Sequence, residues 1–506
     1  MSDERPVARP GDSASDERPA ARPGDSAPER AGFGEVLAVR EFRALFLSSV
    51  VSWVGDYLAR AAIIVLVYQQ SQSVSLSAAS FAISYLPWIL GGPLLSALAE
   101  RYPYRRVLIA TDLSRAVPIA LIALPGVPIP VILVLLFVAM LGAPPTQATR
   151  SALIPLVLER RLLVTGLALN SSTIQGAQVF GYLAGATLAA GVNPRLGLAL
   201  DALSFLLSAA IVAAGIRPRA STADPARRRH LLRETGEGFQ IVFGTPALRS
   251  IAVMVFALAS FVVLPEGLAA SWAAVFHDGR ETDGFDQGLI MAAGPIGFVA
   301  GGIVAGTLGS QAFKQRLTRP LALFTPICLA LTAFAPNAVT VAVLVALSGV
   351  GQGVLVPTLN SAFVLALPHG MRARAFGVIA GGLQLTQGIA VLATGVLAEH
   401  SSIPLVVGLW SLGGVVLMAV VSARRTGDAP AQEPPAPAEA GATAGPVAPR
   451  EPMRDPLVPR ATPGVRDDLR SDQAPDPGAG TARGGPAATH ITPGPVRRHG
   501  AGRLDR

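Results

Sequence analysis

The sequence predicts an all-α membrane protein with twelve transmembrane helices in two six-helix bundles. Of the 506 residues, 51% are hydrophobic and only 15% are charged, and the mean hydropathy is +0.49 although both ends of the chain are polar. Apolar runs of about 20 residues, enough to cross a bilayer core of about 30 Å, recur between residues 42 and 421. Arginines gather in every second turn between these runs, a pattern typical of turns that face the cytoplasm.

The chain begins with a segment, residues 1–39, that we expect to be disordered. Ser2–Ala14 and Ser15–Ala27 are near-identical copies rich in Pro, Gly, Asp and Arg. A segment of this composition cannot bury enough apolar area to offset the entropy lost on ordering. It also has no apolar core of the kind that marks a signal peptide. The first helical bundle is therefore expected to begin near residue 40.

Twelve apolar runs follow, and a polar break divides them six and six. The first bundle spans residues 40–217, with helices expected at 43–68, 76–99, 105–124, 128–149, 162–190 and 195–216. The second bundle spans 248–423, with helices expected at 249–273, 286–309, 319–335, 338–363, 374–398 and 402–422.

Two further segments complete the organisation of the chain. In the linker 218–247, Leu231, Phe239 and Phe243 recur at roughly helical spacing, which indicates an amphipathic helix on the cytoplasmic membrane surface. Residues 424–506 are rich in Pro, Ala, Gly and Arg without periodicity, so we expect a disordered tail.

The distribution of arginine predicts the topology. Arginines concentrate near residues 40–43, 101–106, 150–161, 217–233, 314–319, 372–374 and 424–425, and the alternate turns have little positive charge. The positive-inside rule then places both termini in the cytoplasm and makes the number of spans even. The same turns and tails account for the net charge of +8, so we expect no nucleic-acid partner.

A short charged hairpin joins the second and third expected spans. The stretch Gly91–Arg115 reads GGPLLSALAERYPYRRVLIATDLSR. It resembles the loop signature of the major facilitator superfamily, roughly G-x-L-a-D-R-x-G-R-R. In this comparison Gly92 matches a glycine that permits close helix packing, and Glu100 stands where the family has aspartate. The basic positions of the signature match Arg101, Arg105 and Arg106.

Three other stretches resemble one branch of that superfamily, the macrolide-efflux proteins and enterobactin exporters. They are LALDALSFLLSA (198–209), ATRSALIPLVL (148–158) and the pair Gly55-Asp56. The resemblance implies a multi-pass protein of the bacterial plasma membrane that exports a drug-like or siderophore-like molecule by alternating access, coupled to protons. We expect a monomer.

The sequence contains no set of residues that indicates an enzyme or a metal site. Cys328 is the only cysteine, and the six histidines lie in turns and tails without partners at helical spacing. Lys314, the single lysine, is followed by Gln315, which excludes a phosphate-binding loop for ATP. We therefore expect no cofactor and no catalysis, with transport driven by an ion gradient or passive.

Two carboxylates within expected spans are candidates for proton coupling, because charge inside a membrane is costly and usually functional. Asp56 lies about midway along the first span, where its alternative role is an ion pair with Arg60 one turn later. Glu266 lies toward the outer end of the seventh span, beside Pro265, where a solvated or structural role is the alternative.

The hairpin provides candidates for a gate. Glu100 and Arg106 can form contacts in one transporter state that break in the other, although an ordinary solvated turn explains them too. Asp112 and Arg115 either brace the hairpin arginines or take part in coupling. For Asp201 we favour a packing or capping role.

Polar uncharged side chains within spans are candidates for the lining of a substrate cavity. As single residues they are equally explained by hydrogen bonds between helices. The set comprises Asn170, Gln175, Gln178, Gln352, Asn360, Gln384 and Gln387.

Taken together, these features predict a proton-coupled exporter of a small organic molecule. Two alternatives remain open from the sequence: an importer or facilitator of a nutrient, and a membrane sensor that does not transport.

Overall fold

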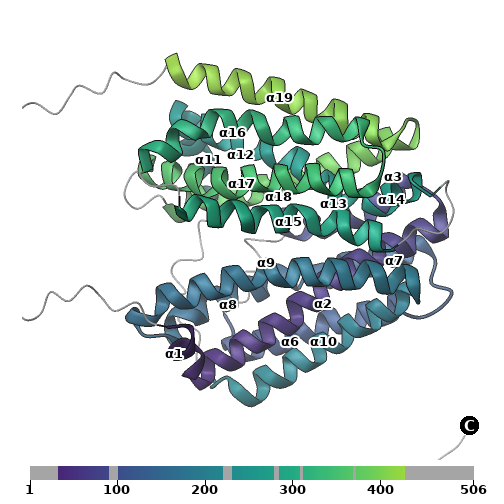
Figure 1. Cartoon of the computed structure of the whole chain (residues 1–506). Coiled ribbons are helices and arrows are strands. Elements are labelled where there is room, and N and C mark those ends of the chain that lie inside the picture. The colour runs from purple at the N-terminus through teal and green to yellow at the C-terminus, as the bar shows by residue number, and fades with distance from the viewer. Residues whose placement is uncertain are drawn as a thin grey trace, which may run out of the picture. The chain divides into compact units, whose positions relative to one another are not determined.

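The computed structural model describes residues 32–90, 101–219, 231–277, 284–307, 311–367 and 372–427. All of them fall within one compact unit, Met1–Gln432, and every regular element among them is a helix (Figure 1). Of the two segments expected to be disordered, residues 1–31 and 428–506 lie outside the described residues, whereas 33–38 and 424–427 are helical. Gly92 and Glu100 also lie outside the described residues.

The first bundle is built around a long helix near its start. Its elements are α1 (Phe33–Ala38), α2 (Arg40–Ser71), α3 (Val74–Ala82), η1 (Ile83–Tyr85), α4 (Leu86–Leu90), α6 (Tyr104–Ile122), α7 (Ile129–Met140), α8 (Ala143–Val157), α9 (Arg160–Gly191) and α10 (Pro194–Gly215). Side chains cap two of these helices: the Ser73 hydroxyl accepts from Leu76 N–H, and the Asn193 amide oxygen accepts from Arg195 N–H.

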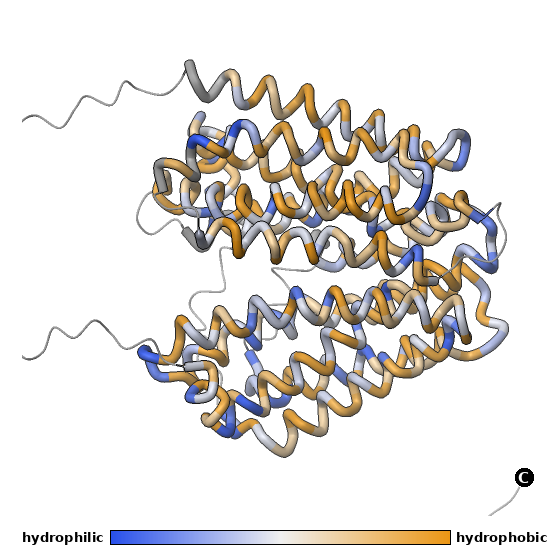
Figure 2. The backbone as a smooth tube through the Cα atoms, viewed as in Figure 1, coloured by the Kyte–Doolittle hydropathy of each residue, from blue (hydrophilic) through white to orange (hydrophobic). Residues whose placement is uncertain are grey.

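The second bundle, with the linker helix α11 before it, is also built of helices. Its elements are α11 (Leu231–Gly244), α12 (Pro246–Val262), α13 (Leu264–Gly267), α14 (Ala269–Val275), α15 (Gly284–Thr307), α16 (Gln311–Leu331), η3 (Thr332–Phe334), α17 (Ala338–Ala366), α18 (Arg372–Glu399) and α19 (Ile403–Gly427). Figure 2 shows hydrophobic residues along the length of these helices, with hydrophilic residues mostly toward the helix ends.

Nine of the expected spans are confirmed as apolar helices. Within the described ranges, nine helical stretches are long and apolar enough to cross a membrane. The other three expected spans also hold helices, although these miss that standard. The span 76–99 is described only to residue 90, α6 carries four charged side chains, and α9 carries a polar run from Asn170 to Gln178. The count of twelve therefore stays a prediction.

Two of the expected spans are broken helices. The span 128–149 consists of α7 and α8, interrupted at Leu141 and Gly142. The span 249–273 consists of α12, α13 and α14, interrupted at Val263 and Leu268. Pro265 lies in the first turn of α13, where its lack of an N–H costs no helical bond.

Small residues let the central helices approach closely. A side chain added at Gly185 of α9 would collide with the backbone of α2, and one added at Gly297 or Gly301 of α15 would collide with the backbone of α17. Such contacts replace the hydrophobic effect as the source of helix association in lipid.

The linker helix α11 lies against the second bundle. Glu237 accepts a hydrogen bond of 2.6 Å from Arg374 of α18, and Gly238 packs on the carbonyl of the same arginine. Phe243 contacts Phe256 of α12, with ring centroids 6.4 Å apart. The expected helix is present and packs on α18 and α12, and its position at the membrane surface stays a prediction.

Among the residues that the structure describes, contacts between the bundles run from their middle to the end away from the clustered arginines, here called the charge-poor end. Gly284 and Gly288 of α15 pack on Ala186 of α9. On the other side of the interface, Glu399 at the end of α18 accepts hydrogen bonds from Ser75 N–H (2.8 Å) and the Ser73 hydroxyl (3.1 Å) at the start of α3.

Candidate functional site

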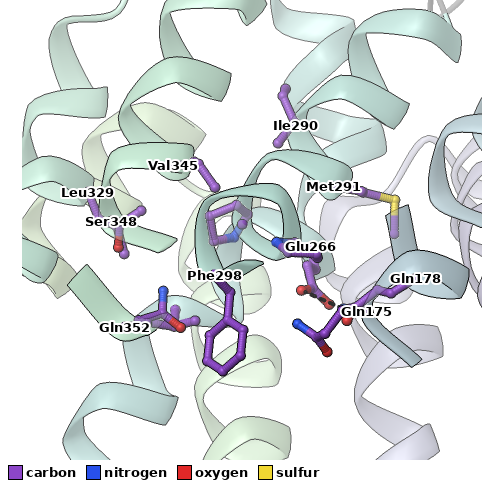
Figure 3. A pocket seen from close by; sticks show the side chains of 14 residues that line it. Gln175, Gln178, Glu266, Ile290, Met291, Phe298, Leu329, Val345, Ser348 and Gln352 are labelled. Carbon is purple, nitrogen blue, oxygen red and sulfur yellow. Dashed lines mark hydrogen bonds between the residues drawn. The ribbon is translucent and has the colours of Figure 1, made fainter. Parts of the chain in front are cut away.

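A cavity of about 160 Å³ lies between the bundles, near the middle of their helices (Figure 3). Its polar lining comes from Gln175 and Gln178 of α9, Glu266 of α13, and Ser348 and Gln352 of α17. The rest of the lining is apolar and comprises Val262, Pro265, Ile290, Met291, Gly294, Pro295, Phe298, Leu329 and Val345. Apolar walls with a few convergent polar groups are features of small-molecule sites, and this cavity combines both.

Glu266 reaches this cavity because the seventh expected span is broken around it. Its carboxylate accepts hydrogen bonds from Gln178 Nε2 (3.2 Å) and from the Tyr182 hydroxyl (2.8 Å). Both donors belong to α9, so the carboxylate bonds across the interface between the bundles. These bonds fit the structural alternative that the sequence left open, and a role of Glu266 in proton coupling stays a prediction.

A second ionic cluster lies within the first bundle, away from this cavity. Asp56 of α2 forms an ion pair with Arg115 of α6, and the Arg115 guanidinium lies 4.3 Å from the centroid of the Phe205 ring. Asp112 accepts a hydrogen bond of 2.7 Å from Ser208 of α10. These contacts tie α2, α6 and α10 together in the interior.

Asp201 belongs to the same cluster. It is fully buried in α10, and its Oδ1 accepts a bond of 3.2 Å from Ser204. With Asp56 and Arg60 it borders a small cavity of about 10 Å³, close to the space that one water molecule needs.

Two interpretations of these charges change with the structure. Asp56 is bridged by Arg115, whereas the sequence suggested Arg60 one turn away. Asp112 and Arg115 contact α10 and α2, so they do not brace the hairpin arginines. Arg105 instead donates to the Ala213 carbonyl.

The remaining gate candidates are exposed or lie outside the described residues. Arg101 and Arg106 are exposed. Because Gly92 and Glu100 lie outside the described residues, the gating role of the hairpin stays a prediction.

Three of the seven candidate cavity residues line the cavity: Gln175, Gln178 and Gln352. Asn360 is exposed, and Asn170, Gln384 and Gln387 are half-buried outside the lining. Sequence reasoning missed Tyr182, Ser348 and Phe298. Ser348 lies four residues before Gln352 on the same helical face, a spacing that the sequence displays; nothing in the sequence marks Phe298.

The described residues contain no group of three or more His, Cys, Asp or Glu side chains that can hold a metal ion. Cys328 is a buried free thiol.

Two helical bundles that enclose a partly polar cavity at mid-helix define a transmembrane transporter. The sequence profile of the Major Facilitator Superfamily matches residues 45–371 and again 320–474. The chain belongs to the major facilitator superfamily.

Solved structures with the same fold include several POT family transporters. One in complex with 5-aminolevulinic acid is 12% identical with a TM-score of 0.61, covering 78% of this chain and 97% of that one. A peptide transporter POT mutant in complex with sulfate is 14% identical with a TM-score of 0.62, covering 79% and 96%. The POT family transporter PepTSo is 12% identical with a TM-score of 0.62, covering 77% and 98%. No curated protein sequence matches the chain.

Proposed function

We propose that this protein is a proton-coupled exporter of a small organic molecule, with Glu266 as the group that carries the proton. The observation that supports this most directly is the position of Glu266. It is the one acidic residue among the described residues of the cavity wall, and it bonds to the opposite bundle. Its protonation state therefore bears on both cargo binding and the contact between the bundles.

The proposed cycle uses the two hydrogen bonds on Glu266. When the carboxylate is ionised, Gln178 and Tyr182 donate to it and hold the middle of the bundles together. When it is protonated, these charge-assisted bonds weaken, so the bundles can separate there. The contacts at the charge-poor end then exchange with contacts at the arginine-rich end, which is the rocking motion of alternating access.

The direction of transport rests on two arguments. The positive-inside rule places the arginine-rich end in the cytoplasm, so with the contacts gathered at the charge-poor end this state opens inward. Outward movement of a drug-like or siderophore-like cargo follows from the resemblance of 148–158 and 198–209 to the exporter branch. The ion pair with Arg115 favours a structural role for Asp56.

Everted membrane vesicles that contain the full-length chain test this proposal. With the lumen acidic, we expect at least one compound from a labelled panel of organic cations, neutral drugs and siderophores to accumulate, and an uncoupler to abolish its accumulation. Glu266→Gln should lose accumulation against a gradient but keep exchange of labelled for unlabelled cargo at saturating cargo concentration, since exchange requires no net proton movement.

Glu35→Gln is the matched control, because Glu35 lies on α1 and pairs with Arg161 at the surface. It should transport as the unaltered protein does. Gradient-driven accumulation that survives in Glu266→Gln would refute the role of Glu266, and accumulation only with an alkaline lumen would show an importer.

A further inference from the structure

We infer that the cavity between the bundles binds a small organic cation, a protonated or quaternary amine on an apolar body, in exchange for the proton on Glu266. This inference rests on the proposed function, because it names the substrate class of the same site. It starts from the charge balance of the cavity wall, and the chemistry of the remaining lining then restricts the ligand further.

The described residues of the cavity wall can carry negative charge only. Glu266 is ionisable, and of the other lining residues that the structure describes, none is lysine, arginine or histidine. An ionised carboxylate in the interior of a helical bundle needs a counter-charge or a proton. A carboxylate on the ligand would instead meet Glu266 without a partner, so acidic ligands fit this wall poorly.

The ionisable groups around Glu266 place no positive charge in the described wall of the cavity. Tyr182 of α9 donates to it directly, and Arg60 and Tyr57 of α2 and Tyr85 of η1 lie within electrostatic range. Arg60 is held over the Tyr57 ring, 5.7 Å from its centroid, and borders the small cavity instead of the large one. Arg60 therefore does not occupy the place of a ligand cation in the large cavity.

The rest of the wall suits the body of such a ligand. Phe298 lies between Gln352 and the pair of Gln178 and Glu266 in the view of Figure 3. An aromatic face attracts ammonium groups, most of all quaternary ones, through its quadrupole. The side-chain oxygens of Gln175, Gln352 and Ser348 can accept N–H bonds from a protonated amine, while Val345, Leu329 and Ile290 offer apolar contact.

The exchange is balanced in charge. As the cation enters, the O–H bond of protonated Glu266 breaks and its proton leaves to water on the side to which the cavity is open. The carboxylate then forms an ion pair with the cation, without a covalent bond. One positive charge replaces another, so the net charge of the cavity is the same in both loaded states.

Three probes of similar size test the inference by binding to the purified full-length protein. Benzyltrimethylammonium is a permanent cation, neopentylbenzene is its uncharged isostere, and phenylacetate is an anion. We expect saturable binding of labelled benzyltrimethylammonium, no competition from phenylacetate, and at least tenfold weaker competition from the isostere. Affinity for the cation should fall as pH is lowered, approaching about tenfold per pH unit once Glu266 is protonated.

Variants separate this inference from the proposed function. Glu266→Gln should bind the cation at least tenfold more weakly and without pH dependence, Glu266→Asp should retain part of both properties, and Glu35→Gln should leave them unchanged. Binding of phenylacetate in the cavity, or equal cation binding in Glu266→Gln, would overturn the inference. If the cation binds through Glu266 but a proton gradient does not move it, the proposed function fails while the inference stands. Gradient-driven export of only an anionic or neutral cargo would support the proposed function and overturn the inference.

Discussion

The ion pair between Asp56 and Arg115 joins two helices inside the first bundle. The two side chains are only 17% and 4% exposed. Asp112 and Asp201 add two further carboxylates to the same cluster, and Arg150, over the Trp53 ring at 5.7 Å, adds a third cation to Arg60 and Arg115. The cluster therefore brings three carboxylates and three arginines together in the interior of the bundle.

Removing one member of this cluster should destabilise the fold. We expect Asp56→Asn to cost about 3–5 kcal/mol, the usual penalty for stranding one charge of a buried pair, and to lower the thermal midpoint in detergent. The double variant Asp56→Asn/Arg115→Gln should recover part of the loss, because neither charge is then left alone. A stable Asp56→Asn protein that has lost only proton coupling would instead return Asp56 to the role of proton carrier.

The sequence could single out Asp56 but could not identify its partner. Arg60 lies one helical turn away, and such local pairs can be read from spacing. Arg115 lies 59 residues away, and its approach depends on how α6 packs against α2, which no sequence period encodes. The bonds between Glu266 and α9 could not be predicted for the same reason, because they depend on how helices far apart in the sequence pack.

At the scale of the helix, α15 offers a matched pair of glycines. A Cβ at Gly297 would collide with the backbone of Ala346 in α17, whereas a Cβ at Gly302 would meet open space. Gly297→Ala should therefore lower the thermal midpoint by forcing the helices apart. Gly302→Ala should leave the midpoint unchanged or raise it slightly, because alanine has the better helix propensity by about 1 kcal/mol. Equal midpoints in the two variants would contradict the close packing.

Hydropathy predicted the positions of the helices better than it predicted their interruptions. Nine spans appear in the expected places, because a bilayer needs long apolar runs. The breaks at Leu141 and Val263 were not predicted, although the second of them presents Glu266 to the cavity. Prolines 144 and 265 lie just after these breaks, but Pro118, Pro155 and Pro357 lie inside unbroken helices, so proline alone does not locate a break.

For the two bundles together, closure at the charge-poor end can be tested by cross-linking. Gly288 and Ala186 face each other across the interface, and a Cβ at position 288 would lie 3.2 Å from the Ala186 Cβ, near the distance that a disulfide needs. In a Cys328→Ser background, Gly288→Cys with Ala186→Cys should form a disulfide that stops transport, and a reductant should restore transport.

The control for this experiment is a disulfide within the first bundle. Gly197→Cys with Ala62→Cys joins α10 to α2, where the corresponding distance is 2.9 Å. It should leave transport intact, because alternating access moves the bundles as units. Transport that continues with the cross-link between positions 186 and 288 would argue against separation at this end.

The contacts of Glu41 bear on whether the protein can be produced as two separate polypeptides. At the start of α2 it accepts bonds from the Arg217 N–H (3.2 Å) and the Arg219 guanidinium, just beyond α10. Helix α2 is thus joined to the segment just after α10 by hydrogen bonds as well as by the chain between them. Two polypeptides cut between Arg219 and Leu231 and produced in the same cell should accordingly assemble into a working carrier, and Glu41→Ala should impair that complementation more than it impairs the uncut protein.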